Sequence, residues 1–425
     1  MINFYKGTEN KVLGKTYDEA LKDLQNDLLK IFDVKNLSIL LGSGCSSYKS
    51  PNPDNADEKI EIGIPTMEPM AFEFYNIDNV DNEYFLLEAD RKFLHDEFKI
   101  NVLEDPFKRN IEKLMEVLFS LKFYYVSANI ALNDEVENQK KEVDRIIDKA
   151  KRFILIKCLN KDNEGSDIEL IEIYQQFYRK LLYRNTNLPK ANIFTTNYDT
   201  YSEKAMDYLG IHYVNGFSGG INKYFNPTVF NYALAEKMDI SQNKWNVIDN
   251  FIYLYKIHGS INWIEDDGAN KMFDVKEVQD VSEAFIKGER NILIYPTPVK
   301  YLATMSAPYS DLFREFQKKL MQNNNVLITL GYSFSDIHIN NLIFQAFTIP
   351  TFRLVIFGEE NPIINKLKKQ NDPRIWLVNG ADDAGEKIHY FKNVVTKVLP
   401  DLSNDEIDEK ITDLIQKLFK GKKDE

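Results

Sequence analysis

The sequence predicts an α/β fold: a Rossmann-like parallel sheet with helices on both faces and a large helical insertion. Short apolar runs recur from residue 191 onward, and each ends in small or polar residues. Helical segments lie between several of these runs, and strands that alternate with helices are typical of a covered parallel sheet. With 425 residues, 44% of them apolar, we predict one domain over residues 1–425.

The first predicted elements are a helix and a strand near the N-terminus. Thr16 and Glu19 have the spacing of a capping box, and apolar residues follow at helical spacing up to Phe32. The apolar run 37–41 predicts a buried strand. The polar stretch 46–61, which is rich in Pro, Asn and Asp, predicts a loop.

A helical insertion over residues 67–188 is predicted to separate this strand from the rest of the sheet. Its apolar residues include a stripe at helical spacing, formed by Ile111, Leu114, Leu118 and Leu121. The charged segment 134–152 predicts a solvated helix.

Six more strands are predicted after the insertion, over residues 192–195, 251–257, 291–295, 325–330, 352–357 and 374–378. Helices are predicted at 201–209, where Gly210 follows, and at 311–321. The stretch 400–425 predicts a C-terminal helix with a charged tail.

The composition argues against several classes of protein. The sequence has no run of roughly 20 apolar residues, which a membrane-spanning helix needs, and its first residues lack an apolar signal segment. Its two cysteines, Cys45 and Cys158, are too few for a four-cysteine zinc module, so we expect a cytoplasmic protein without a metal. The net charge of −12 argues against a chain that coats nucleic acid, but leaves room for a local basic groove.

Polar or glycine-rich segments follow four of the predicted strands, where an open parallel sheet binds its ligands. The first segment holds Gly42 and Gly44, whose missing side chains would let backbone N–H groups approach a pyrophosphate. The third glycine of the dinucleotide fingerprint is replaced by Ser47. An ordinary glycine-rich turn therefore explains this segment equally well.

The second and third segments carry the candidate catalytic residues Asn197 and His258. Asn197 lies between Thr196 and Asp199, and such polar groups at the end of a buried strand need each other or a ligand. One of them could cap the next helix, although a cap does not need all three. His258 closes an apolar strand and precedes a glycine, and a purely structural histidine is the alternative interpretation.

The fourth segment begins with Gly331 and Ser333 and leads into a helix at Asp336. A strand that ends in this way before a helix N-terminus is suited to an anion or a ribose. Helix capping by Ser335 or Asp336 is the alternative.

Taken in order, these segments resemble the sirtuin superfamily. The segment 42–46 is similar to its Gly-Ala-Gly-x-Ser phosphate loop, 63–65 to its Gly-Ile-Pro element, 196–199 to Gln-Asn-x-Asp, 258–259 to the catalytic His-Gly pair and 331–333 to Gly-Thr-Ser. The resemblance implies NAD as substrate and catalytic roles for Asn197 and His258. The binding residues it implies are Gly42, Ser43, Gly44, Cys45, Ser46, Pro65, Thr196, Asp199, Gly331, Ser333, Asp336 and Gly358.

Departures from the family pattern argue against protein deacylation. The zinc module of the deacylating sirtuins is missing, and Tyr-Pro-Thr-Pro at 295–298 stands where they have Phe-Gly-Glu. The chain looks more like the sirtuin-like domains of bacterial anti-phage systems, of the HerA-associated or Thoeris type. That resemblance implies an NAD+ glycohydrolase that depletes NAD in antiviral defence, a homo-oligomer and a HerA-type ATPase as partner.

Two other functions fit parts of the pattern. A sensor would bind NAD or ADP-ribose without hydrolysing it, but would not need a His-Gly pair at the strand end. A nuclease subunit of a HerA-type complex would use Asp199, Asp336 and His338 as metal ligands. Asp336 and His338 lie two residues apart at a helix start, so their side chains would point in different directions.

Overall fold

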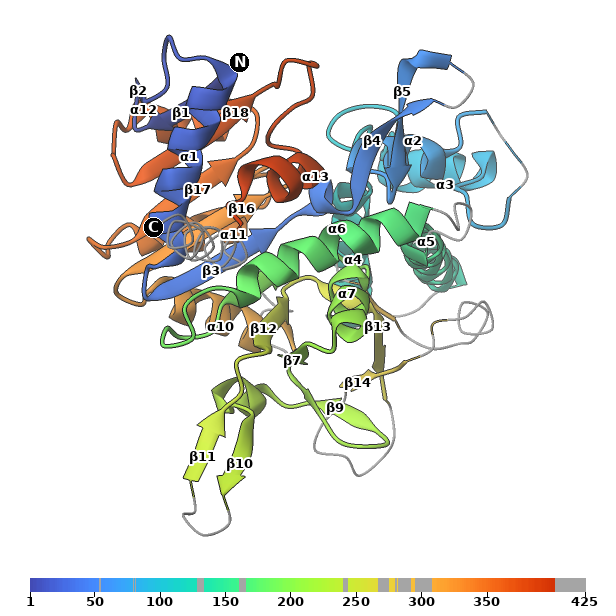
Figure 1. The fold of residues 1–425 in the computed structure, drawn as a ribbon. Coiled ribbons are helices and arrows are strands. Elements are labelled where there is room, and N and C mark those ends of the chain that lie inside the picture. Colours follow the sequence, from blue (N-terminus) through green and yellow to red (C-terminus); the bar gives the residue numbers. More distant parts are fainter. Residues whose placement is uncertain are drawn as a thin grey trace, which may run out of the picture.

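A computed structural model of the chain describes residues 1–52, 55–78, 80, 82–127, 134–159, 166–239, 244–266, 275–279, 281, 292–294 and 308–401. Its centre is a nine-stranded sheet (Figure 1). In spatial order the strands are β2 (Glu9–Asn10), β1 (Ile2–Lys6), β18 (Ile375–Gly380), β17 (Arg353–Phe357), β16 (Asn325–Leu330), β3 (Asn36–Leu41), β6 (Asn192–Thr195), β12 (Phe251–Lys256) and β7 (His212–Val214).

The seven strands from β18 to β7 pair in parallel, and β1 pairs with β18 in the antiparallel direction. The central strands are apolar along their length because both of their faces are covered. In β3, Ile39 and Leu41 belong to one apolar cluster, whereas Leu40 belongs to the other. The predicted Rossmann-like α/β fold is confirmed.

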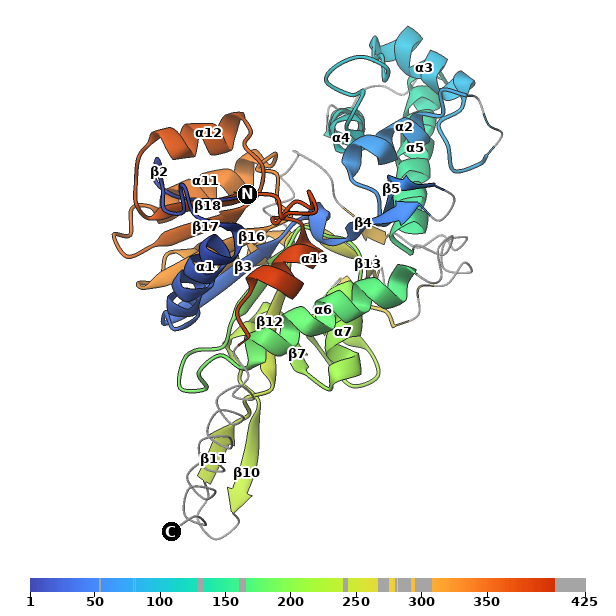
Figure 2. The same cartoon turned by 45° about the horizontal axis from the view of Figure 1, so that its top comes forward.

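Helices cover both faces of this sheet (Figures 1 and 2). The first apolar cluster includes residues of α1 (Tyr17–Phe32), α6 (Ser166–Leu182) and α7 (Tyr201–Leu209). The second includes residues of α10 (Tyr309–Leu320), α11 (Ile337–Ala346) and α12 (Pro362–Lys369). The predicted capping box is present at α1, where the Thr16 side chain accepts from Glu19 N.

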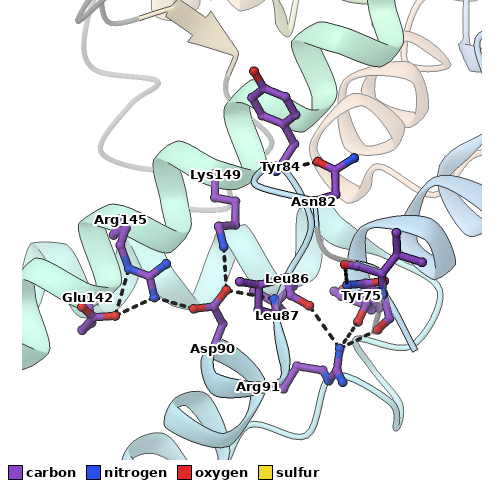
Figure 3. Close-up of polar contacts among 12 residues, drawn as sticks. Tyr75, Asn82, Tyr84, Leu86, Leu87, Asp90, Arg91, Glu142, Arg145 and Lys149 are labelled. Carbon is purple, nitrogen blue, oxygen red and sulfur yellow. Dashed lines mark hydrogen bonds and ion pairs between the residues drawn. The ribbon is translucent and has the colours of Figure 1, made fainter. Parts of the chain in front are cut away.

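The remaining helices of the predicted insertion lie to one side of the sheet (Figure 2). They are α2 (Met67–Tyr75), α3 (Glu88–Phe98), α4 (Ile111–Ser127) and α5 (Asp134–Leu159). A buried carboxylate, Asp90, joins α3 to α5 through Lys149 Nζ at 2.8 Å and through Arg145 (Figure 3). The segment 134–152 is not fully solvated, because α5 buries an apolar face that includes Val143 and Ile147.

The prediction of a loop over residues 46–61 is wrong. These residues form a hairpin of β4 (Ser47–Asn52) and β5 (Asn55–Gly63), paired in the antiparallel direction. A two-stranded ribbon is held by backbone hydrogen bonds, so its sequence needs no apolar run. Tyr48 and Ile64 are buried at its base.

The prediction that residues 291–295 belong to the parallel sheet is also wrong. The described part, β15 (Ile292–Ile294), pairs antiparallel with β13 (Gly259–Glu265). This second sheet also contains β14 (Val275–Glu277), β9 (Lys223–Phe225) and β8 (Phe217–Ser218). A separate hairpin of β10 (Ala235–Asp239) and β11 (Lys244–Val247) projects from the body (Figure 1).

The predicted C-terminal helix at 400–425 lies almost entirely outside the described residues. Before it, α13 (Phe391–Asn393) and η4 (Val394–Val398) pack near α1 and α6. A short helical turn, η1 (Ser43–Cys45), follows β3, and η3 (Pro227–Asn231) follows β9. Within the described ranges, none of the helices combines the length and apolar character needed to cross a bilayer.

Candidate functional site

The predicted site segments follow five consecutive strands of the sheet: β17, β16, β3, β6 and β12. Since these strands are parallel, their carboxyl ends lie at one edge. The register aligns Leu330, Leu41, Thr195 and Lys256, the last residues of four neighbouring strands. Segments as distant as 42–46 and 331–336 are thereby brought together.

The glycines after β3 and β16 pack against one another. A side-chain carbon at Gly42 would lie 2.4 Å from Gly331 O, and one at Gly331 would lie 2.7 Å from Cys45 N. Gly331 also has a φ of +60°, which favours glycine. Close contact between two loops is therefore one reason for glycine at these positions, and the approach of a pyrophosphate stays a prediction.

Most backbone N–H groups of the 42–46 loop already have partners. Gly42 N donates to Leu330 O, Gly44 N to Gly331 O, and Cys45 N and Ser46 N donate within the loop. Ser43 N is not among these donors, and the Ser43 side chain is exposed.

Asn197 is held by its amide nitrogen and offers its amide oxygen. Nδ2 donates to Gly42 O at 3.0 Å and to Ser46 Oγ at 2.8 Å. The side chain is buried, with 8% of the residue exposed, and Oδ1 has no hydrogen-bond partner among the described residues. A buried acceptor without a donor is costly, so Oδ1 marks a position where a ligand donor would be stabilised.

Asp199 is linked to Asn197 through the Ser46 hydroxyl, which contacts both side chains. Ser46 Oγ donates to Asp199 Oδ2 at 2.6 Å, and Oδ1 accepts from Tyr201 N at the start of α7. Asp199 therefore holds the first amide of α7, although the N-cap position is Thr200, whose side chain makes no cap hydrogen bond. Asp199 also fixes the Ser46 hydroxyl that contacts Asn197.

Lys256 was not predicted from the sequence, and it holds this turn through hydrogen bonds from its ammonium group. Lys256 is 1% exposed, and its Nζ donates to the carbonyls of Tyr198 and Asp199 and to Glu203 Oε1 at 3.1 Å. Burial raises the pKa of the Glu203 carboxyl, and the lysine opposes that effect. The available signal was a charged residue inside the apolar run 251–257.

His258 lies where the chain leaves the parallel sheet for the second sheet, between β12 and β13. Gly259 has a φ of +95°, so the turn after the histidine favours glycine. The imidazole Nε2 lies 3.0 Å from Asp336 Oδ2, and both side chains are buried. The pairing of these two residues was not foreseen from the sequence.

Asp336 is also the N-cap of α11. Its Oδ1 accepts from His338 N at 2.8 Å and from Ile339 N at 3.2 Å. The loop before it is braced by Asn340, whose side chain contacts Tyr332 OH and Phe334 O. Asp336 thus has the capping role that the sequence suggested and a contact with His258 as well.

The other predicted binding residues lie around this centre. Thr196 N donates to Leu41 O, and Ile64 N donates to Ser46 O, which brings Pro65 beside the 42–46 loop. Ser333 is exposed, and its carbonyl accepts from Asn361 Nδ2 in the loop that begins at Gly358.

The Cys45 side chain is buried and donates from Sγ to Leu330 O. Burial raises the pKa of the Cys45 thiol, so the group is a neutral donor and not a nucleophile. Its side chain therefore contributes to the packing of the loop, not to a contact with a ligand.

The described residues contain no cluster of three or more His, Cys, Asp or Glu side chains arranged to hold a metal. Asp199 and Asp336, two of the ligands considered for a nuclease, are bound to different partners, Ser46 and His258. The nuclease alternative gains no support from this arrangement.

Comparison with known families agrees with this architecture. No curated protein matches the chain. One family model, described as a SIR2-like domain, matches residues 191–380. The matched segment contains Asn197, His258 and Asp336 and ends before α13. SIR2-like domains are often NAD-using enzymes, and this match supports a Sir2-like domain in the chain.

Proposed function

We propose that this protein is an NAD+ glycohydrolase, which cleaves the nicotinamide–ribose bond to give nicotinamide and ADP-ribose. The observation that carries the proposal is the pair Asn197 and His258 on neighbouring strand ends. Asn197 has an unpaired buried acceptor, and His258 is fixed by Asp336. The SIR2-like match over 191–380 is compatible with NAD-related activity.

The reaction needs little from a general acid. When the C1′–N bond breaks, both electrons stay on the nicotinamide nitrogen, which was cationic in NAD+ and leaves neutral. The ribose passes through an oxocarbenium-like centre, as in glycoside hydrolysis. A water oxygen then bonds to C1′ and loses one proton.

Asn197 and His258 would assist different parts of this step. Asn197 Nδ2 is held by Gly42 O and Ser46 Oγ. Its Oδ1 has no partner but is covered from solvent, so it would orient a ribose hydroxyl or the attacking water once the groups over it move aside. His258 would accept the proton that the water or a ribose hydroxyl gives up.

The direct test is to incubate the purified protein with NAD+ and to quantify nicotinamide and ADP-ribose. We expect one nicotinamide for each ADP-ribose. His258→Ala should lower the rate by about 10²–10⁴-fold, the range for a lost acid–base group. Asn197→Ala should lower it by about 10²–10³-fold, as for a lost polar contact to the transition state.

His212→Ala is a matched control, because His212 is exposed at the start of β7 and pairs with Phe251 at the amino end of β12, whereas His258 follows the carboxyl end of that strand. This variant should keep the wild-type rate. All variants should show wild-type thermal unfolding. Full turnover in both site variants would remove the proposed roles.

An NAD or ADP-ribose sensor remains the second candidate, since the same loops would serve it. Titration calorimetry with ADP-ribose, together with the nicotinamide assay, separates the two functions. Binding without any nicotinamide release would favour the sensor.

The biological setting is proposed from the resemblance to anti-phage domains. We expect a homo-oligomer that is held inactive until it depletes NAD during infection, with a HerA-type ATPase as partner. The test is to measure nicotinamide release with and without a candidate ATPase and to determine the mass of the complex. Equal rates and no association would argue against this partner.

A further inference from the structure

We infer that Asp336 is a positioning residue that fixes His258 as the Nε2–H tautomer and makes Nδ1 the proton acceptor of the site. The inference rests on the proposed function only for the use of Nδ1 in catalysis. The tautomer itself follows from contacts in the free protein. A histidine that serves as a base must present a lone pair to its substrate, so the tautomer determines which ring nitrogen can act.

The contact between the two residues specifies where the proton lies. A carboxylate is an acceptor only, and His258 Nε2 lies 3.0 Å from Asp336 Oδ2. In a neutral imidazole the nitrogen beside the carboxylate must therefore carry the hydrogen. The other nitrogen, Nδ1, then holds the lone pair.

Nδ1 of His258 has no hydrogen-bond partner among the described residues. It is also not among the buried polar atoms that are sealed from solvent without a partner. The Tyr198 ring packs 6.4 Å from the imidazole between ring centres. The lone pair is therefore available to a water or a hydroxyl at the edge that also carries Asn197.

Asp336 is itself held in place by the helix that it caps. Its Oδ1 accepts from His338 N and Ile339 N, the first free amides of α11. The carboxylate orientation is thus set by α11, which follows β16. The histidine follows β12, and two strands, β3 and β6, lie between. The contact between Asp336 and His258 therefore connects β16 to β12 across the ends of β3 and β6, which Gly42 and Asn197 follow.

This arrangement gives Asp336 a second effect after proton transfer. Once Nδ1 has taken a proton, the imidazolium lies beside the Asp336 carboxylate, and the pair is stabilised by opposite charge. The aspartate keeps its own charge throughout, as in a catalytic triad.

Two variants of Asp336 separate the contact with His258 from the helix cap. In Asp336→Asn the side-chain oxygen is needed by His338 N and Ile339 N, so the NH₂ group faces His258. The NH₂ group of the introduced Asn would donate to His258 Nε2, so the ring hydrogen would move to Nδ1. In Asp336→Ser the hydroxyl can still cap α11 but is too short to reach the ring, which leaves the tautomer unconstrained. Asn and Ser are both strong N-cap residues, so α11 stays capped in either variant.

The experiment is nitrogen NMR of the imidazole rings in the full-length protein labelled at histidine. The chain has five histidines, so His258→Gln identifies the signals of interest. We expect protonated-type Nε2 and unprotonated-type Nδ1 in the wild type, the reverse in Asp336→Asn and averaged signals in Asp336→Ser. A wild type with hydrogen on Nδ1, or an Asp336→Asn variant with an unchanged tautomer, would overturn the inference.

Nicotinamide release provides the second measurement. Asp336→Asn should lower kcat by at least about 100-fold, within the range for loss of acid–base help, with a much smaller change in KM. Asp336→Ser should retain more kcat than Asp336→Asn, although it removes more of the side chain. The opposite order would contradict the inference. If the wild type releases no nicotinamide, the proposed function fails while the NMR result still decides the tautomer.

Discussion

At the scale of single residues, Asp336 links a helix to the candidate site, because its Oδ1 caps α11 and its Oδ2 contacts His258. Asn197 and His258 could be selected because each is polar and follows a buried run. The partner of His258 could not be selected from the sequence, because Asp336 is 78 positions away and its presence is already explained by its role as a helix cap. A cap and a second contact can share one carboxylate because it has two oxygens.

The buried ion pair between Lys256 and Glu203 allows a prediction for the free energy of unfolding. Lys256→Met should lower the free energy of unfolding by about 3–5 kcal/mol, because the buried carboxylate of Glu203 loses its cation. The measurement is chemical denaturation, with nicotinamide release recorded in parallel. The double variant Lys256→Met with Glu203→Leu should recover most of the stability.

The activity of that double variant should stay low, because the carbonyls of Tyr198 and Asp199 still lack their donor. A single variant as stable as the wild type would show that the pair does not support the turn. Full activity in the double variant would show that the turn does not need Lys256.

At the scale of elements, the glycines after β3 have a packing contact that the sequence did not reveal. Gly42 and Gly44 do end β3 at the edge where a ligand would bind. Their nearest atoms, however, belong to Gly331, which follows another strand. A single sequence does not reveal which loop a glycine approaches, because the neighbour is set by strand order.

Gly42→Ala tests this packing. The new methyl group would lie 2.4 Å from Gly331 O and 2.7 Å from Tyr332 Cα, both backbone atoms that cannot rotate away. We expect a loss of about 1–3 kcal/mol in unfolding free energy, as for other overpacked sites. The matched control is Gly358→Ala, whose methyl group would meet only side-chain carbons at 3.7 Å. Equal stability of the two variants would contradict the packing argument.

The Asp90 contacts give a pH-dependent prediction for the helices beside the sheet (Figure 3). Burial favours a higher pKa for Asp90, but hydrogen bonds from Lys149 and Arg145 outweigh it and lower the pKa below its usual value. A lowered native pKa means that the contribution to stability is complete above the unfolded value of about 3.9 and is lost as the pH falls through the native value.

Asp90→Asn should therefore destabilise the protein near pH 7 by about 1.5–3 kcal/mol, the range for a hydrogen bond to a charged group. The difference from the wild type should shrink as the pH falls below about 4, where the wild-type carboxyl also loses its charge. Denaturant midpoints of both proteins across this pH range provide the measurement. A difference that does not change with pH would mean that the charge of Asp90 is not involved.

At the scale of the whole molecule, the sequence predicted the parallel sheet because most of its strands are apolar runs, although it did not predict β7, which is short and partly exposed. It did not predict β1, which is short and pairs at the side of the sheet with β18, residues 375–380. It also did not predict the second sheet, because short antiparallel strands such as β8 and β9 carry little apolar signal. β1 and the strands of the second sheet form because they pair with other strands, several of them far along the chain, so their own sequences give little sign of them.

The whole-molecule prediction concerns the helices between β5 and β6. α6 lies within the predicted insertion 67–188 but packs against α7 and Phe391, with Tyr174, Phe177 and Tyr178 fully buried. We propose that α2 to α5 form the separable part. Replacing residues 68–160 with a short Gly-Ser linker should leave a protein that unfolds cooperatively.

A longer deletion, 67–188, should not give a folded protein, because it removes the aromatic side chains of α6 from the core. Circular dichroism and denaturation of both deletion variants provide the comparison. Folding of the longer deletion would show that α6 is not part of the core.

We propose that Asn197 and His258 act on the same ribose carbon, although they lie 61 residues apart in the chain. The most direct measurement is a crystal structure with an NAD analogue that resists cleavage. We predict that Asn197 Oδ1 and His258 Nδ1 both lie within hydrogen-bond distance of the ribose beside the nicotinamide, or of one water next to its C1′. An analogue bound with these two atoms in separate pockets would contradict the account.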